Sequence, residues 1–366
     1  MRVLMVSKAL VVGAYHGKLA ALARHPGLDL LAVIPPSWLE RGRAQVAEPV
    51  TPVGYAIRYT PLWLNGHYHL HVYPRLGRIV RAFRPDLIHI DEEPYNAATA
   101  QACWLARRHR ARAVFFAWQN LPRAYPPPFR WFERYVFAQA AGIAGTHSAK
   151  SVLQLKGFRG PCVVIPQFGI DRHVYAPIER SRPSGPFRVG YAGRLVPEKG
   201  VDRLIRAVEE LDGDVELLVA GAGLAEQELR RLVAGRAQVR FLGALPSHGM
   251  PGFYRNLDVF VQPTVGRTGW TEQFGRAAIE AMASGVPTIV SDAGELPALV
   301  GDAALIVPAG DVVALRDAIS TLRDAPERHR DLGTAGRAHV LHRYTHEEIA
   351  ARTAAFYHQV VHAAGP

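Results

Sequence analysis

Two basic residues flank a glycine-containing turn in residues 190–200, which read GYAGRLVPEKG. A short apolar run ends at Ala192, Arg194 follows two positions later, and Lys199 stands directly before the start of a helical pattern. Arginine offers a planar fork of donors, lysine a point charge, and the amino end of a helix attracts anions. The segment therefore has the chemistry of a phosphate site. Two ordinary surface cations beside a strand-to-helix turn are the alternative.

A second segment, residues 272–287, combines two glutamates with a glycine at the start of a helical pattern. Glu272 precedes the helix and Glu280 lies inside it, so the two carboxylates are roughly 8 to 12 Å apart along the helix axis. This separation is too long for one acid–base pair, but it suits two groups of an extended ligand. A carboxylate can accept hydrogen bonds from vicinal hydroxyls, and Gly275 lets backbone amides approach a ligand. Two solvated glutamates on a helix face are the alternative.

Short apolar runs alternate with helical patterns, which predicts parallel sheets with helices on both faces. At 366 residues the chain is too long for one core. Polar residues, two prolines and a glycine in residues 179–186 mark a boundary between domains. We expect a first domain over 1–178, a second over 187–345, and a final helix over about 346–366 that packs back on the first. The predicted strands are 2–7, 29–35, 86–91, 113–118, 142–146, 162–165, 188–192, 216–220, 239–242, 259–262, 287–291 and 304–307.

The composition limits the possible partners and compartments. The formal net charge is +11, but its basic residues are scattered along helical patterns without a recognised nucleic-acid module, so we expect no nucleic-acid partner. Residues 1–7 lack the apolar core of a signal peptide, and no apolar run approaches the roughly 18 residues that span a bilayer, so we expect a cytoplasmic protein. Residues 128–137 (PFRWFERYVF) mix aromatic and basic side chains. Peripheral association with the anionic inner face of a membrane is one interpretation of this stretch, and packing of its aromatics in the core is the other.

The stretches GYAGRLVPEKGVDRL (190–204) and EQFGRAAIEAMASGVPTIVSDAGELPALV (272–300) together resemble the family-four group of retaining glycosyltransferases, the glycosyl transferases group 1. The resemblance covers the second domain well and the first only weakly. It implies the GT-B fold, with two Rossmann-like, doubly wound α/β domains that face each other across a cleft. It also implies an enzyme that moves a sugar from a nucleoside-diphosphate sugar to an acceptor hydroxyl, with retention at the anomeric carbon. The acceptor itself, whether glycan, lipid or small molecule, stays unidentified.

The resemblance further implies roles for the residues of the two motifs. Arg194 and Lys199 would hold the donor diphosphate and Glu272 would contact the donor sugar, so these three are the candidate catalytic residues. The remaining candidates for donor binding are Glu280 on the ribose, Phe274 and Gly275 through their backbone amides, Leu245 beside the base, and Gly13 in a loop over the phosphates. We expect no metal and no other cofactor, because fixed cations stabilise the charge of the leaving diphosphate.

The chain departs from the family pattern in its first domain. Gly13 is followed by alanine where many members have a second glycine, and Trp118, Gln119 and Asn120 stand where many relatives have a histidine. The candidate acceptor residues are His16, Glu92, Trp118, Gln119 and Asn120, and the acidic run 91–93 is expected to face the cleft. Two alternatives remain open. One is a sugar-nucleotide epimerase of the same architecture, and the other is a nucleotide-sugar binding subunit without turnover, which the missing histidine would favour.

Overall fold

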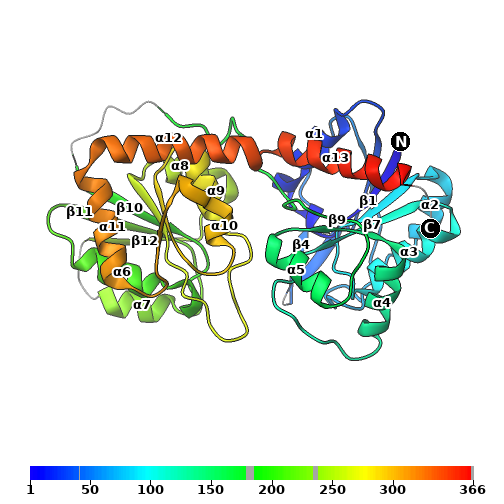
Figure 1. Cartoon of the computed structure of the whole chain (residues 1–366), viewed down its shortest axis with the longest axis horizontal. Helices are drawn as coiled ribbons and strands as arrows, with labels where there is room; N and C mark the ends of the chain where they lie inside the picture. The colour runs from blue at the N-terminus through cyan, green and yellow to red at the C-terminus, as the bar shows by residue number, and fades with distance from the viewer. Residues whose placement is uncertain (41, 179–184, 234–237, 364–366) are drawn as a thin grey trace. The chain divides into compact units, whose positions relative to one another are not determined.

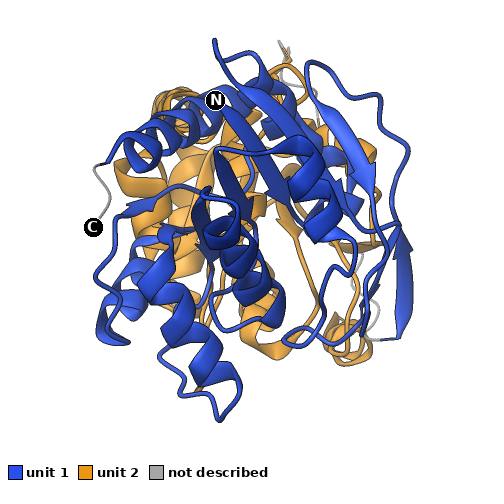
Figure 2. Ribbon diagram, turned by 90° about the vertical axis from the view of Figure 1, so that its right-hand side faces the viewer, with its two compact units in different colours: residues 1–169, 346–366 blue, residues 170–345 orange. Residues whose placement is uncertain are grey.

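The computed structural model describes residues 1–40, 42–178, 185–233 and 238–363. The chain divides into two compact units: unit 1 comprises Met1–Gly169 and His346–Pro366, and unit 2 comprises Ile170–Thr345 (Figures 1 and 2). Residues 179–184 of the expected boundary and 364–366 of the expected final helix lie outside the described residues.

Unit 1 is built on a seven-stranded parallel sheet in the order β5-β2-β1-β6-β7-β8-β9. Its strands are β1 (Arg2–Val6), β2 (Asp29–Ile34), β5 (Ala56–Tyr59), β6 (Leu87–Ile90), β7 (Arg112–Ala117), β8 (Ala141–Ala144) and β9 (Cys162–Val164). Most of these strands are apolar throughout because both faces of the sheet are covered. The six strands predicted for this half of the chain are all present.

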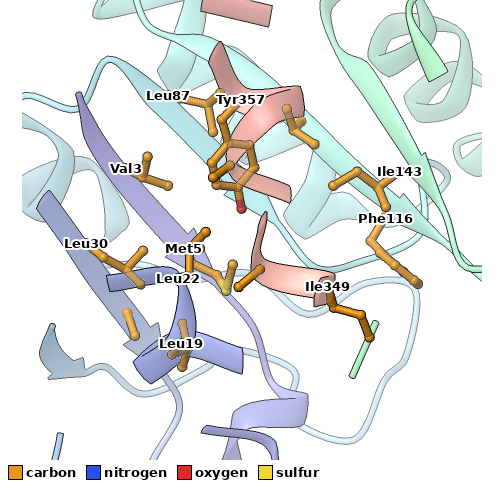
Figure 3. Close-up of a cluster of buried hydrophobic side chains, with 14 of the residues drawn as sticks. Val3, Met5, Leu19, Leu22, Leu30, Leu87, Phe116, Ile143, Ile349 and Tyr357 are labelled. Atoms are coloured by element: carbon orange, nitrogen blue, oxygen red, sulfur yellow. The ribbon is translucent and has the colours of Figure 1, made fainter. Parts of the chain in front are cut away.

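Two helical layers cover this sheet. One face packs against α1 (His16–Ala23) and α13 (His346–His362). The other packs against α2 (Leu76–Phe83), α3 (Ala97–Arg108), α4 (Phe129–Gln139) and α5 (His147–Leu155). Figure 3 shows Ile349 and Tyr357 of α13 and Leu19 and Leu22 of α1 gathered over strand residues such as Met5. The last helix of the chain is therefore part of the core of unit 1.

The sequence patterns did not predict three strands of unit 1. Strand β5 pairs in parallel with β2 at one edge of the sheet, and β3 (Ser37–Glu40) pairs with β4 (Arg43–Val46) in a separate antiparallel ribbon. All side chains of the three strands are exposed or half-buried except that of Trp38, so none of the strands carries a continuous apolar run. Their pairing depends on tertiary contacts rather than on local pattern.

Unit 2 contains a six-stranded parallel sheet in the order β12-β11-β10-β13-β14-β15. Its strands are β10 (Phe187–Ala192), β11 (Val215–Ala220), β12 (Val239–Gly243), β13 (Val259–Gln262), β14 (Thr288–Ser291) and β15 (Leu305–Val307). Helices α6 (Val201–Glu209), α7 (Glu226–Val233) and α11 (Val312–Asp324) cover one face. Helices α8 (Met250–Arg255), α9 (Arg276–Ala283), α10 (Leu296–Val300) and α12 (Pro326–Arg343) cover the other. Both units are thus Rossmann-like and doubly wound, as predicted.

The boundary between the units differs from the expected one, because residues 170–178 belong to unit 2 rather than to the first domain. Tyr175 is buried in the core of unit 2. Arg255 of α8 donates to the carbonyl oxygens of Ala176 and Val174, over 3.0 and 2.7 Å, and Arg337 of α12 donates to that of Tyr175. These bonds fix the segment to unit 2 even though it precedes the polar stretch that the sequence marks.

Candidate functional site

The candidate donor site of unit 2 lies where the strand order of its sheet reverses. Strand β10 has β11 on one side and β13 on the other, so the crossover connections leave in opposite directions there. In open α/β sheets, ligands bind outside the carboxyl ends of strands at this point. The loop after β10 contains Arg194 and Lys199, and the loop after β13 leads to Glu272. The two motifs are therefore brought to one edge of the sheet.

Lys199 and Glu272 form an ion pair between these loops. The Lys199 ammonium contacts Oε2 of Glu272, and both side chains are largely buried, at 13% and 10% exposure. The same oxygen accepts from Gln262 Nε2 over 3.1 Å and from Thr264 Oγ1 over 3.3 Å. The ammonium also lies 5.3 Å from the ring centre of Trp270. This network holds a cation and a carboxylate in fixed positions beside the end of β13.

Arg194 lies at the same edge with an exposed side chain. Its carbonyl oxygen accepts from the hydroxyl of Tyr191 over 2.9 Å, which holds the turn after β10 against the sheet. An exposed guanidinium can reorient to meet a ligand, whereas Lys199 is already engaged. The two cations that the sequence singled out are thus present but differ in their readiness to bind an anion.

Helix α9 begins at this edge, and its cap requires glycine. Gly275 has φ +70°, and a Cβ atom there would lie 2.4 Å from Cδ2 of Leu296. Only glycine adopts such a conformation without strain, so the tight turn places the amino end of α9 beside Glu272. Phe274 is half-buried, with its ring against Tyr344 at 6.0 Å.

Glu280 is buried inside α9 and is hydrogen-bonded at both oxygens. Oε2 accepts from the hydroxyl of Tyr254 over 2.9 Å, and Oε1 accepts from Nε of Arg276 over 2.8 Å. Burial, followed by the charge of Glu280, raises the pKa of Tyr254 well above its usual value. Each carboxylate oxygen can accept a second hydrogen bond, so a ribose hydroxyl would join this network rather than find a vacant group.

Leu245, the predicted neighbour of the base, follows β12 and is partly buried against the α8 side of the core. It lines a pocket of about 290 Å³ together with Leu242 and Phe253. A larger hollow of about 670 Å³ lies at the opposite edge of the sheet, where Asp258 and Pro287 precede β13 and β14. Its lining includes Ser284 to Pro287 from the second motif, but none of Arg194, Lys199, Glu272 and Glu280. The candidate site therefore lies at the carboxyl edge.

Unit 1 carries its own pocket at the carboxyl ends of its strands, with a volume of about 260 Å³. The residues that line it come from the ends of β1, β6, β7 and β9 and from the loop before α2: Lys8, Ala9, Tyr68, His69, Asp91, Glu92, Glu93, Tyr95, Asn96, Phe116, Trp118 and Gln167. Glu92 and Trp118 were predicted by number, and the acidic run 91–93 by position. The sequence analysis did not name Lys8, Tyr68, Tyr95 and Gln167, which also line the pocket. Lys8 could have been named, because it directly follows the predicted strand 2–7.

The two glutamates of this pocket have opposite electrostatic surroundings. Burial alone would raise the pKa of Glu92, but Lys8 and His71 outweigh it and hold that pKa at about 2. Glu92 contacts the Lys8 ammonium, and its Oε1 lies 3.3 Å from Nε2 of His71. Burial raises the pKa of Glu93 to about 7, although its Oε1 accepts from the backbone amides of Trp118 and Gln119 over 2.8 and 3.1 Å. One carboxylate is thus firmly ionised and its neighbour titrates near neutral pH.

The segment that replaces the family's histidine is held by these carboxylate contacts. Trp118 donates its indole N–H to Gln167 Oε1 over 2.7 Å, in addition to its backbone bond to Glu93. The side-chain oxygen of Gln119 accepts from Lys156 over 3.2 Å. Of the three residues 118–120, Trp118 alone is among those that line the described pocket, and Gln119 and Asn120 are not.

His16 is enclosed within unit 1 rather than placed at the pocket. Its Nδ1 lies 2.7 Å from the hydroxyl of Tyr55 and its Nε2 lies 2.8 Å from the carbonyl oxygen of Leu10, so both ring nitrogens are engaged. Burial lowers the pKa of His16. Gly13 begins the short 3₁₀ turn before α1, and its amide donates to Glu48 Oε2 over 2.7 Å. His16 is thus held within unit 1 and is not among the residues that line the described pocket, so its place at the acceptor stays a prediction.

The predicted interfacial helix is mostly packed. Tyr135 and Phe137 of α4 lie against the core, whereas Trp131 is 60% exposed. None of the helices in the described part of the chain is long and apolar enough to cross a membrane. Within the same ranges, no group of three or more His, Cys, Asp or Glu side chains is arranged to hold a metal ion.

Comparison with protein families matches both halves of the chain. The family described as "Glycosyl transferases group 1" matches residues 186–324, and the family described as "Glycosyl transferase 4-like domain" matches residues 12–167. The chain belongs to the group 1 glycosyltransferases. The matched regions contain the donor-site residues of unit 2 and most of the residues that line the pocket of unit 1.

Several curated relatives are named as mannosyltransferases, and others as D-inositol 3-phosphate glycosyltransferases. A "GDP-mannose-dependent monoacylated alpha-(1-6)-phosphatidylinositol monomannoside mannosyltransferase" of Corynebacterium glutamicum is 40% identical over 154 residues, which is 40% of each chain. A "Phosphatidyl-myo-inositol mannosyltransferase" of Mycobacterium leprae is 32% identical over 57% of this chain and 56% of the relative. The matches thus span about half the length of these curated relatives.

Solved structures share the fold of the whole chain. Anabaena HepE in complex with UDP covers 98% of this chain and 100% of its own, with a TM-score of 0.72 and 18% identity. The sucrose-phosphate synthase of Thermosynechococcus elongatus covers 100% of both, with a TM-score of 0.71 and 21% identity. At these identities the likeness establishes the fold alone, which is that of GT-B glycosyltransferases.

Proposed function

We propose that this protein transfers a sugar from a nucleoside-diphosphate sugar, bound at the carboxyl edge of the unit 2 sheet, to a hydroxyl of an acceptor. The observation that carries this proposal is the buried Lys199–Glu272 pair at the reversal of strand order, with the exposed Arg194 beside it. A ligand with both phosphate and sugar matches such a pairing, because the cations attract the diphosphate and the carboxylate accepts from sugar hydroxyls.

The resemblance to retaining glycosyltransferases implies how the transfer would proceed at these groups. The acceptor oxygen forms a bond to the anomeric carbon as the bond from that carbon to the diphosphate oxygen breaks, and the acceptor proton passes to the departing phosphate. The configuration is retained because attack occurs on the face that the diphosphate leaves. Arg194, Lys199 and the amino end of α9 stabilise the charge that builds on the diphosphate, which is the main catalytic contribution. We expect transfer to persist after treatment with a chelator, because these fixed positive groups take the place of a metal.

The relatives supply candidates for the donor. Several are named as GDP-mannose-dependent, and the HepE structure contains UDP. We therefore take GDP-mannose as the first donor to test and UDP-glucose as the second. A sugar-nucleotide epimerase is not favoured, since the relatives reported above are named as transferases.

A panel of nucleoside diphosphates tests this proposal. GDP, UDP, ADP and dTDP are each added to the protein, and the unfolding midpoint is measured, since a ligand that binds only the folded state raises it. We expect one of the four to raise the midpoint clearly. The products of the matching sugar nucleotide then separate the functions: transfer releases the nucleoside diphosphate with a new glycoside, epimerisation gives a new sugar nucleotide, and a subunit without turnover gives neither. No midpoint change with any of the four would contradict the proposal.

The same protein is proposed to work in the cytoplasm, at the inner face of the membrane. The support is the net charge of +11 and the exposed aromatic side chains of unit 1, chiefly Trp131 at 60% and Trp63 at 66% exposure. Exposed tryptophans with nearby basic residues suit an anionic lipid surface. Flotation with vesicles of phosphatidylglycerol, compared with vesicles of phosphatidylcholine, tests this. Equal recovery with the two lipids would remove the anionic membrane as a partner.

A further inference from the structure

We propose that the hollow at the amino edge of the unit 2 sheet binds a small organic phosphate, with the phosphate group on a set of arginines and an apolar group against the neighbouring wall. This amino-edge hollow lies between α12 and the turns that precede β13 and β14. None of the donor-site residues lines it, so the inference goes beyond the proposed transfer and does not depend on it.

The amino-edge hollow has a size that suits a small molecule. Its volume of about 670 Å³ lies within the range of roughly 300 to 1,000 Å³ that is typical of ligand sites. Close packing of α12 sets one boundary, because a Cβ atom at Gly333 would lie 2.5 Å from the carbonyl oxygen of Gly285. Only a glycine at position 333 lets α12 lie so near the turn before β14. The hollow is therefore bounded by closely packed elements of unit 2 alone.

Positive charge dominates the ionisable groups of the hollow. Arg255 of α8 and Arg330 and Arg337 of α12 line it, and Asp258 is the one acidic residue among the described residues of the lining. The carboxylate of Asp258 already accepts from a backbone amide of β10 over 2.7 Å. His329 also lines the hollow, with Nε2 2.7 Å from the carbonyl oxygen of Asp258. Three arginines beside one carboxylate attract an anion.

Carboxylates do not neutralise these arginines within the described parts of the chain. Arg255 and Arg337 donate to main-chain carbonyl oxygens of residues 174–176, and Arg337 also donates to that of Ala283. These acceptors carry no net charge. Burial, followed by the charge of Arg172, lowers the pKa of Arg337, as expected for a cation without a counter-ion. A phosphate group would supply the missing negative charge.

The arginines keep donors that a ligand can reach. Arg330 is exposed, and Arg255 and Arg337 are half-buried. Among the described residues, Nη1 of Arg255 and both Nε and Nη2 of Arg337 have no hydrogen-bond partner. A guanidinium group presents its donors in a planar fork that matches two oxygens of a phosphate, and hydrogen bonds between charged groups are the strong ones. The donors of α8 and α12 thus suit a phosphate group.

The rest of the lining is mainly apolar. Leu257, Val286 and Leu322 are buried, and Pro287 and Leu341 extend the apolar wall. Inorganic phosphate alone would leave this wall in contact with water, whereas an apolar group attached to the phosphate would remove it from water. The combination of arginines and apolar side chains therefore favours an organic phosphate over the free ion.

Three probes test this chemistry. 2-Naphthyl phosphate carries both groups, 2-naphthol lacks the phosphate, and inorganic phosphate lacks the apolar rings. Each is titrated into the protein by isothermal titration calorimetry. We expect 2-naphthyl phosphate to bind, and each of the other two to bind roughly tenfold more weakly or not at all. The inference is overturned if 2-naphthyl phosphate does not bind at millimolar concentration, or if it binds no more tightly than 2-naphthol or inorganic phosphate.

Substitutions on α12 locate the binding. Arg330→Glu reverses a charge of the lining, and Thr334→Trp places a large side chain at an exposed position of the lining, so each should weaken 2-naphthyl phosphate by roughly tenfold. Arg328→Glu is the matched control, because Arg328 is an exposed arginine of the same helix outside the lining. It changes the net charge equally and should leave the affinity within roughly twofold.

Far-UV circular dichroism verifies that the variants are folded, and either lining variant decides the question if the other fails to fold. Affinity equal to that of the parent protein in the folded lining variants would overturn the inference. An equal loss in Arg328→Glu and Arg330→Glu would do the same, because overall charge rather than the hollow would then explain the binding.

The donor site is separated by one more variant. Arg194→Ala should bind 2-naphthyl phosphate as the parent protein does, because Arg194 lies at the opposite edge of the sheet. Loss of binding in Arg194→Ala with full binding in Arg330→Glu would place the probe at the donor site and overturn the inference. The panel of nucleoside diphosphates tests the transferase proposal independently, so the failure of one proposal is distinguishable from the failure of the other.

Discussion

Replacing Glu93 by glutamine removes a carboxylate that is costly to ionise in the folded protein. Its pKa of about 7 lies above the value of 4.5 that an ordinary glutamate has. Folding raises the pKa of this carboxyl group, so the folded state binds the proton more tightly than the unfolded state does. The resulting stabilisation is complete below pH 4.5 and is lost as the pH rises to about 7. At pH 8, Glu93→Gln should therefore increase the free energy of unfolding. Glu92→Gln should do the reverse, because the pKa of Glu92 is held at about 2 and its ionised form stabilises the fold above pH 4.5.

The two pKa values set the size of each effect. Each differs from 4.5 by about two and a half units, and one unit corresponds to about 1.4 kcal/mol, so each effect reaches at most about 3 to 4 kcal/mol. For Glu93→Gln we expect a gain approaching this value at pH 8 that shrinks to about 1 kcal/mol at pH 5. For Glu92→Gln we expect a loss of about 3 kcal/mol at both pH values, because Glu92 is ionised in the folded protein throughout this range.

Urea unfolding followed by tryptophan fluorescence measures these changes. Five of the six tryptophans, at positions 38, 63, 104, 118 and 131, belong to unit 1, so the signal reports mainly on the unit that contains both glutamates. Glu347→Gln is the control, because Glu347 is an exposed glutamate of α13, and its free energy of unfolding should change by less than about 0.5 kcal/mol. The reasoning is refuted if Glu93→Gln is less stable than the parent protein at pH 8, or if its effect does not depend on pH.

Three substitutions in unit 2 give further expectations. Gly275→Ala should lower the free energy of unfolding by about 2 kcal/mol or more, because it forces a left-handed residue and a clash with Leu296; a denaturation midpoint equal to that of the parent protein would contradict this. Glu280→Gln should weaken binding of the nucleoside diphosphate by roughly tenfold in calorimetry, and unchanged affinity would remove its ribose role. Glu272→Gln should reduce the rate of transfer far more than the affinity for the nucleoside diphosphate, and full activity would exclude its contact with the donor sugar.

Much of the fold follows from local pattern. The twelve predicted strands are all present, because strands covered on both faces carry continuous apolar runs that are visible in the sequence. The three missed strands, β3, β4 and β5, are short and partly exposed, and β5 pairs with β2 at the edge of the sheet. The boundary at Gly169 was missed for a similar reason, since hydrogen bonds from Arg255 and Arg337 fix residues 170–178 to unit 2, and no local pattern records those bonds.

The candidate site was predictable to the extent that chain position determines it. Arg194, Lys199 and Glu272 follow strands that end at one edge of a sheet, so their proximity could be expected, but the direct pairing of Lys199 with Glu272 depends on loops 73 residues apart. The ends of β1 and β9 offered the same signal for Lys8 and Gln167, which was not used. His16 shows the limit of such reasoning. Its ring is held by Tyr55, which is distant in the sequence, and by the carbonyl oxygen of Leu10 in the preceding turn, and no sequence pattern indicates either contact.

The central claim, that the carboxyl edge of the unit 2 sheet binds a diphosphate through Arg194 and Lys199, is tested most directly by isothermal titration calorimetry. The ligand is whichever of GDP, UDP, ADP and dTDP raises the unfolding midpoint most. Arg194→Ala and Lys199→Ala should each weaken binding by roughly tenfold or more, because a charge-assisted hydrogen bond contributes about 1.5 to 3 kcal/mol. Arg203→Ala, which removes a cation of α6 paired with Asp202, should leave the affinity unchanged. Affinities equal to that of the parent protein in both Arg194→Ala and Lys199→Ala would contradict the account.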